Sequence, residues 1–190
     1  MPVAYRDLVD IIKQRRNTKN FKDREVSRSD IEILIDSAVW APNHRSTEPW
    51  KFFVIPKNSD MREKIGQGLV SLQEESTGKA LSEDQKSRIK AQFDVSTTLV
   101  FCFSAVDDNT EITEENYAAV CCAIQNIQLV AESLGLGVGW STGRIAKIKN
   151  LKDIFGIEQE LKIAGVLTVG YPDDRALKNR KDFKLSTKWL

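Results

Sequence analysis

The segment spanning residues 15–21, RRNTKNF, concentrates hydrogen-bond donors in a short stretch. Guanidinium, amide, hydroxyl and ammonium groups follow one another in Arg15, Arg16, Asn17, Thr18 and Lys19. Because arginine forks match the geometry of phosphate oxygens, this pattern indicates a possible anion site. Cations at the end of a helix also stabilise its dipole, and the segment taken alone favours that simpler interpretation.

The loop at residues 41–50, APNHRSTEPW, contains the only histidine of the chain, His44. A single histidine without further ligands in its loop does not make a metal site. His44 is therefore interpreted either as a ligand contact or as a residue that hydrogen-bonds within its own loop. Loops between rigid elements frequently carry binding residues, although this loop alone slightly favours the second interpretation.

A glycine-rich segment, GLGVGWSTG, occupies residues 135–143. It follows a helical pattern rather than a strand, so it is not a dinucleotide-binding fingerprint. Its alternating glycines would let a flat group approach the backbone, with Trp140 as a stacking surface and Ser141 and Thr142 as hydroxyl donors. A turn leading into a strand, with Trp140 in the core, is an equally good interpretation.

A basic stretch near the C-terminus follows the last apolar run. Its cationic residues are Arg175, Lys178, Arg180 and Lys181. They are interpreted either as a segment that closes over a phosphate or, more commonly for such a run, as a solvated tail.

The sequence offers no clear setting for catalysis by side chains alone. The chain has no P-loop, no HExxH and no cluster of metal ligands, and its one histidine has no plausible nucleophile setting. If the protein is an enzyme, we therefore expect a cofactor to carry the chemistry.

Hydrophobic spacing predicts the elements that position these segments. Helices are expected within residues 3–14, 27–42 and 113–135, and short aromatic and β-branched runs predict buried strands at 50–56, 97–105 and 162–172. A polar and charged stretch at about residues 60–95 is expected to be a helical insertion. Helices and strands do not alternate regularly, so the predicted class is α+β.

The helix expected at residues 113–135 is apolar on more than one side. Such a helix is buried either inside a larger core or against a partner subunit.

Composition restricts the partners and the compartment. A chain of 190 residues is expected to form a single domain over 1–190. Its 28 Lys+Arg and 27 Asp+Glu residues nearly cancel, which argues against nucleic-acid and membrane-surface partners. Three cysteines without a CxxC pair and an N-terminus without an apolar leader indicate a cytoplasmic protein.

Taken together and in this order, the four segments resemble the nitroreductase family of FMN-dependent oxidoreductases, especially its smaller members. The resemblance covers nearly the whole chain. It implies a nitroreductase-like fold, with a central, mostly antiparallel sheet flanked by helices, and an intertwined homodimer that holds FMN between its subunits. It also implies a hydride donor, NADH or NADPH, and a small, flat, electron-poor acceptor such as a nitroaromatic or a quinone.

The resemblance further implies roles for individual residues. Arg15 and Arg16 would bind the FMN phosphate, Asn17 would be a polar contact, and Lys19 would lie near N1 and O2 of the flavin. Trp40 and His44 would contact FMN across the subunit interface. The remaining cofactor-binding positions would be Trp140, Ser141, Thr142 and Arg180.

Two positions differ from the common family pattern. Asn17 stands where serine is common, and Glu48 stands where glutamine or asparagine is common. Asn17 keeps the ability to hydrogen-bond, whereas Glu48 adds a negative charge that is expected either to alter substrate choice or to pair with Arg45.

The alternative to an oxidoreductase is an FMN-binding scaffold or sensor with little turnover.

Overall fold

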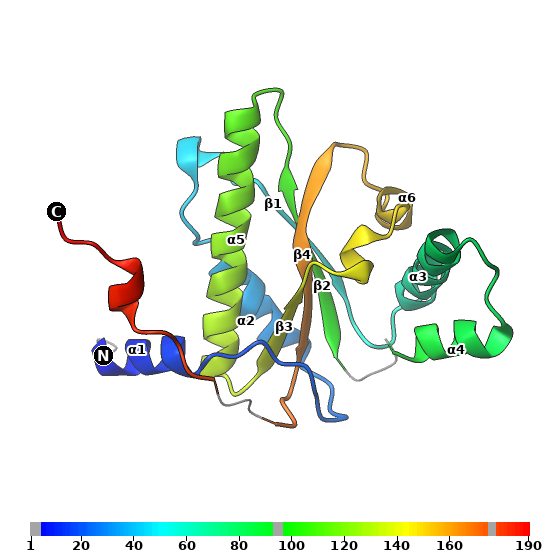
Figure 1. The fold of residues 1–190 in the computed structure, drawn as a ribbon, viewed down its shortest axis with the longest axis horizontal. Helices are drawn as coiled ribbons and strands as arrows, with labels where there is room; N and C mark the ends of the chain where they lie inside the picture. Colours follow the sequence, from blue (N-terminus) through cyan, green and yellow to red (C-terminus); the bar gives the residue numbers. More distant parts are fainter. Residues whose placement is uncertain (1–4, 93–96, 175–177) are drawn as a thin grey trace.

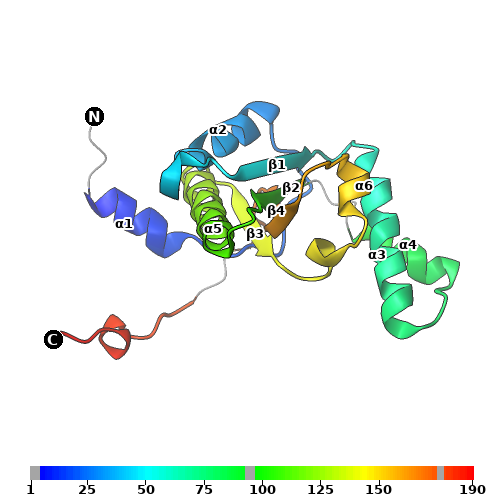
Figure 2. The ribbon, with the colours of Figure 1, turned by 90° about the horizontal axis from the view of Figure 1, so that it is seen from above.

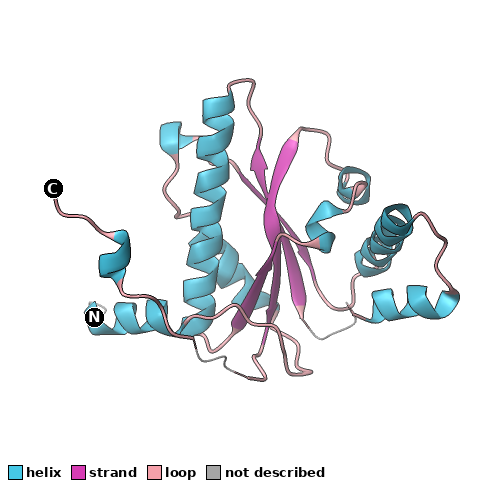
Figure 3. Ribbon diagram, viewed as in Figure 1, coloured by secondary structure: helices cyan, strands magenta, loops and turns pink. Residues whose placement is uncertain are grey.

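The computed structural model describes residues 5–92, 97–174 and 178–190. In these residues a four-stranded antiparallel sheet in the order β1-β2-β4-β3 forms the centre of the fold. The strands are β1 (Trp50–Ile55), β2 (Thr98–Ala105), β3 (Gly137–Ser141) and β4 (Leu161–Gly170). Helices flank the sheet (Figure 3), which confirms the expected α+β class and the mostly antiparallel sheet.

Two layers of helices enclose the sheet (Figures 1 and 2). One face carries α2 (Arg28–Ala38) and α5 (Thr110–Ser133). The other face carries α3 (Met61–Thr77) and α6 (Leu151–Phe155), with α4 (Glu83–Ala91) beside α3. α3 and α4 occupy most of the stretch expected to be a helical insertion, and its residues 93–96 lie outside the described part of the chain.

The alternation of β2 explains why both faces are apolar. Val100 and Cys102 pack with residues of α2 and α5, whereas Leu99, Phe101 and Phe103 pack with residues of α3 and α6. Successive side chains of a strand point to opposite faces, so an uninterrupted apolar run fills both cores. The buried strand predicted at residues 97–105 is confirmed by β2.

α1 (Tyr5–Gln14) and the C-terminal residues, with the short helix η3 (Phe183–Ser186), extend on the side of α5 (Figures 1 and 2). Both segments expose apolar side chains: Leu8, Ile12, Phe183, Leu185, Trp189 and Leu190. No helix among the described residues is both long and apolar enough to cross a bilayer.

Two details differ from the sequence expectations. α5 begins before Thr113, because Asn109 Oδ1 accepts a hydrogen bond from Glu111 N at 2.9 Å. The Thr113 hydroxyl instead bonds to the backbone of Asp107. The glycine-rich segment forms edge strand β3, which its glycines had made hard to distinguish from a turn.

Candidate functional site

The segment RRNTKNF at residues 15–21, called the basic segment below, lies along the free edge of β3. Thr18 N donates to Val138 O at 3.0 Å, and Asn17 Oδ1 accepts from Trp140 N at 2.7 Å. A Cβ added at Gly139 would lie 2.5 Å from Thr18 O. The alternating glycines of β3 therefore admit the protein's own backbone, where the sequence suggested space for a flat ligand.

The chain that follows β4 holds the basic segment from its other side. Phe21 forms a β-bridge with Pro172, and Lys22 N donates to Tyr171 O at 2.8 Å. Asn20 Nδ2 donates to Asp174 Oδ2 at 3.0 Å. Residues 17–22 are thus fixed between β3 and residues 171–174.

A cavity of about 680 Å³ opens beside this junction. Its size is in the range of small-molecule and cofactor sites. Four of the residues predicted to bind a cofactor line it: Asn17, Lys19, Trp140 and Ser141. The other lining residues are Thr18, Asn20, Phe21, Gln92, Thr97, Leu99, Gly139, Thr168 and Asp173.

The half-buried Trp140 belongs both to the cavity wall and to the core. Its Nε1 donates to Ala164 O at 3.2 Å, and a Cβ at Gly165 would overlap the indole. Its ring packs against the core cluster that contains α5. The two interpretations of Trp140, ligand surface and core aromatic, are therefore compatible.

Three arginines, Arg15, Arg16 and Arg180, form a cation cluster at the start of the basic segment. Arg15 Nη1 donates to Gln128 Oε1 of α5 at 3.1 Å. Burial lowers the pKa of Arg15, the nearby Arg180 and Arg16 lower the pKa further, and Glu132 partly opposes them. The guanidinium remains charged, because its ordinary pKa lies far above neutrality. An anion bound here would relieve this repulsion.

Arg16 makes different contacts from its neighbour. Its Nη1 donates to Gln14 O at 3.0 Å and to Arg15 O at 2.9 Å, as well as to Lys13 O. The carbonyls of Lys13 and Gln14 belong to the last turn of α1, and that of Arg15 follows it directly. Arg16 therefore acts in the described structure as the helix-terminal cation of the simpler interpretation.

Trp40 follows the end of α2, and His44 lies apart from this cluster. Trp40 is 80% exposed, and His44 is exposed in the short helix η1 (His44–Ser46). The loop is anchored near the start of α5, where Thr47 Oγ1 donates to Asn116 Oδ1 at 2.8 Å. Arg15 contacts α5 at Gln128, about 18 Å further along the helix at 1.5 Å per residue. A single chain therefore does not bring His44 to the cation cluster.

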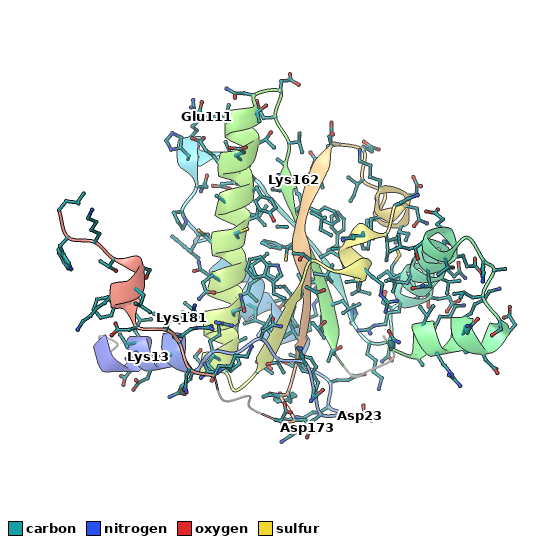
Figure 4. The ribbon with its side chains drawn as sticks, in the orientation of Figure 1. Lys13, Asp23, Glu111, Lys162, Asp173 and Lys181 are labelled. Atoms are coloured by element: carbon teal, nitrogen blue, oxygen red, sulfur yellow. The ribbon has the colours of Figure 1, made fainter. Side chains whose placement is uncertain are left out.

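The side-chain view shows the end of α5 near the His44 loop and the end of the molecule that holds the cavity. In Figure 4, Glu111 marks the end of α5 beside the His44 loop, and Asp173, which lines the cavity, lies at the opposite end of the molecule. Arg45 Nε lies 3.5 Å from Glu115 Oε2, so the described ion pair of Arg45 is with α5 rather than with Glu48.

The backbone of the His44 loop is unusual. Arg45, Ser46 and Glu48 have φ values of 59°, 51° and 43°, a region that non-glycine residues rarely adopt. Asn43 Oδ1 accepts a hydrogen bond from Glu48 N at 3.0 Å and helps to hold this conformation. Strained backbone of this kind is common at binding sites.

Two other predicted positions, Thr142 and Arg180, are not among the residues that line the cavity. Thr142 directly follows β3 and is exposed, and Arg180 is exposed in the C-terminal segment near Arg15. Arg175 lies outside the described residues.

The sequence did not lead to the prediction of Gln128 as a partner of Arg15. The signal that could have indicated it is an amide side chain on a strongly apolar helix.

Comparisons with known proteins show which family this chain matches. Residues 12–171 match the family model described as "Nitroreductase family". YfhC of Bacillus subtilis (strain 168) is 28% identical over 167 residues, which cover 88% of this chain and 85% of YfhC.

Solved structures share the fold. A nitroreductase-like family protein from Bacillus cereus superposes with a TM-score of 0.82 at 25% identity, over 100% of this chain and 99% of that one. The FMN-dependent nitroreductase NfnB from Mycobacterium smegmatis, solved in complex with NADPH, gives a TM-score of 0.75 at 15% identity, over 97% and 99% of the two chains.

Proposed function

The chain belongs to the nitroreductase family, as its match over residues 12–171 establishes, and from this premise we propose that it is an FMN-dependent NAD(P)H oxidoreductase. The observation that carries the proposal is the cation cluster of Arg15, Arg16 and Arg180, since Arg15 and Arg16 directly precede Asn17 in the wall of a cavity of about 680 Å³. NfnB, which shares the fold, is described as FMN-dependent and as binding NADPH. The whole chain, residues 1–190, would act as one domain with a helical insertion at about residues 60–95.

The residues of the site fit FMN chemically. FMN combines a flat, mostly apolar ring system with a dianionic phosphate. The cavity supplies an aromatic wall in Trp140 and polar groups in Lys19 and Ser141, while Arg15 and Arg180 supply cations for a phosphate. An anion at this cluster would offset the mutual repulsion that lowers the pKa of Arg15.

FMN, when bound, would supply the redox chemistry by accepting hydride from NADH or NADPH and passing it to an electron-poor acceptor such as a nitroaromatic or a quinone. The protein's own residues would orient and stabilise. Lys19 would place a positive charge at the pyrimidine edge of the ring, and Thr142 would add a polar contact beyond Ser141. Asn17 would act mainly through Trp140 N, since that bond occupies its side-chain oxygen.

We further propose that two chains form an intertwined homodimer in which Trp40 and His44 of one chain complete the site of the other. The separation of His44 from Arg15 within one chain supports this proposal. So do the exposed apolar residues of the C-terminal segment, Phe183, Leu185, Trp189 and Leu190, which a monomer leaves in water.

The alternative function is an FMN-binding scaffold or sensor with little turnover. It uses the same cation cluster and cavity, so the two functions differ in reduction rather than in binding. The two functions also differ in the acceptor. Only the oxidoreductase must bind a small, flat acceptor beside FMN.

The test is a visible absorption spectrum of the purified full chain after FMN is added and the excess removed, followed by anaerobic addition of NADH or NADPH. A flavin band that is retained and then bleaches supports the oxidoreductase. A band that persists with both nicotinamides favours the scaffold, and a colourless protein contradicts FMN binding.

A further inference from the structure

Gln128 of α5 holds the Arg15 guanidinium in place. Its side chain is only 4% exposed, and its Oε1 accepts from Arg15 Nη1 at 3.1 Å. Its Nε2 lies 3.5 Å from Gln125 Oε1, a second contact that turns the amide oxygen towards Arg15. The buried amide oxygen of Gln128 therefore faces the Arg15 guanidinium.

Gln128 is uncharged, so it does not reduce the positive charge of Arg15. A carboxylate at position 128 would pair with Arg15 and cancel its charge locally. Glu132, one turn further along α5, already partly offsets the cluster. A glutamine fixes the guanidinium by hydrogen bonding while leaving its positive charge available to an anion.

The position of Gln128 makes it an effective anchor. It lies on the buried face of α5, the helix that also packs against the sheet. Arg15, by contrast, follows the last residue of α1, where a long side chain has considerable rotational freedom. The hydrogen bond therefore couples a mobile cation to the rigid centre of the fold.

We propose that Gln128 is a positioning residue that orients Arg15 towards the phosphate of FMN and so sets the preference of the site for FMN over riboflavin, which lacks that phosphate. This inference rests on the proposed function. It assigns a role to a residue outside the cavity that acts only through Arg15.

The test compares FMN and riboflavin binding to the full-length protein and to Gln128→Met and Gln128→Glu. Dissociation constants are measured by quenching of flavin fluorescence. The expected result is about tenfold weaker FMN binding in both variants, with riboflavin binding unchanged. Gln128→Met removes a hydrogen bond to a charged group, which has about this value, and Gln128→Glu keeps the hydrogen bond but offsets the charge of Arg15. Gln128→Glu keeps the size and the acceptor, so it reports even if the methionine variant does not fold.

Asn126→Ala is the matched control, since Asn126 Nδ2 donates to Ser37 O at 3.1 Å from the same helix without a contact to Arg15. It should leave the ratio of FMN to riboflavin affinity unchanged. In an Arg15→Met background, Gln128→Met should have no further effect on FMN binding.

The outcomes separate the two proposals. Equal weakening of both ligands, or unchanged FMN binding in the Gln128 variants, would overturn the positioning role while the proposed function stands. If the unaltered protein binds neither flavin, the proposed function fails and the role of Gln128 fails with it.

Discussion

Adjacent arginines with the same chemistry make different contacts in this protein. Arg15 reaches the buried amide of Gln128, whereas Arg16 folds back on the carbonyls that end α1. The sequence predicted a cationic segment but could not assign these contacts, because the partner of Arg15 is 113 positions away along the chain. Residue type was predictable here, and the partner was not.

Lys19 gives a prediction about ligand binding. It lines the cavity and is expected to supply a cation to the flavin, so Lys19→Ala should weaken FMN binding about tenfold or slow its reduction. Lys22→Ala is the control, because Lys22 lies on the same segment but not among the residues lining that cavity. Equal FMN affinity and equal reduction rates in both variants would remove Lys19 from this role.

Cys102 gives a prediction about stability and pH. It is fully buried in β2, and burial raises the pKa of its thiol well above the ordinary value. The unfolded chain therefore releases this proton first, so the contribution of Cys102 to stability is complete below the ordinary thiol pKa of about 8.5 and is lost as pH rises above it. Urea unfolding at pH 7 and pH 10 should show a smaller alkaline loss in Cys102→Ala than in the unaltered protein. An identical loss would contradict this account.

At the scale of elements, the strands that were predicted are those with strong side-chain patterns. β1, β2 and β4 are rich in aromatic and β-branched residues. Their successive side chains alternate between the two faces of the sheet, so the sequence indicates which of them pack in each core. β3 was ambiguous because glycine gives no side-chain signal, and its strand conformation depends on pairing with β4 and with the basic segment. The four candidate segments were recognised individually, while their assembly depends on such long-range pairing.

Gly139 tests the junction between β3 and the basic segment. Gly139→Ala should destabilise the protein by about 1–3 kcal/mol, because the new Cβ would meet Thr18 O at 2.5 Å and force the two backbones apart. Gly143→Ala is the control, since its nearest neighbour would be the flexible Ser141 hydroxyl at 3.3 Å. Thermal melting of both variants measures the difference, and equal melting temperatures would argue against a tight junction.

At the scale of the whole molecule, the arrangement of the candidate residues agrees with the proposed homodimer. The Arg15 contact lies towards one end of α5, and the His44 loop lies beside the other. Under a two-fold axis each chain could offer its His44 loop to the cation end of its partner. The sequence suggested this arrangement only through the apolar excess of the long helix and through family resemblance.

The C-terminal segment tests the dimer. Removal of residues 183–190 would delete the exposed Phe183, Leu185, Trp189 and Leu190, which the proposed dimer covers. The shortened chain should shift towards monomer and bind FMN more weakly, because Trp40 and His44 of the partner would no longer complete the site. Sedimentation velocity measures the first effect, and a dimer of unchanged stability would contradict it.

The pairing of residues 17–22 with β3 and with residues 171–174 also determines when the site can exist during synthesis. Asn17 is made roughly 120 residues before Val138, and Phe21 roughly 150 residues before Pro172. At typical elongation rates of about 5–20 residues per second, the basic segment stays unpaired for about 6–30 seconds. Both pairings need residues that are made late in synthesis, so the proposed FMN binding would be one of the last steps in the biogenesis of this protein.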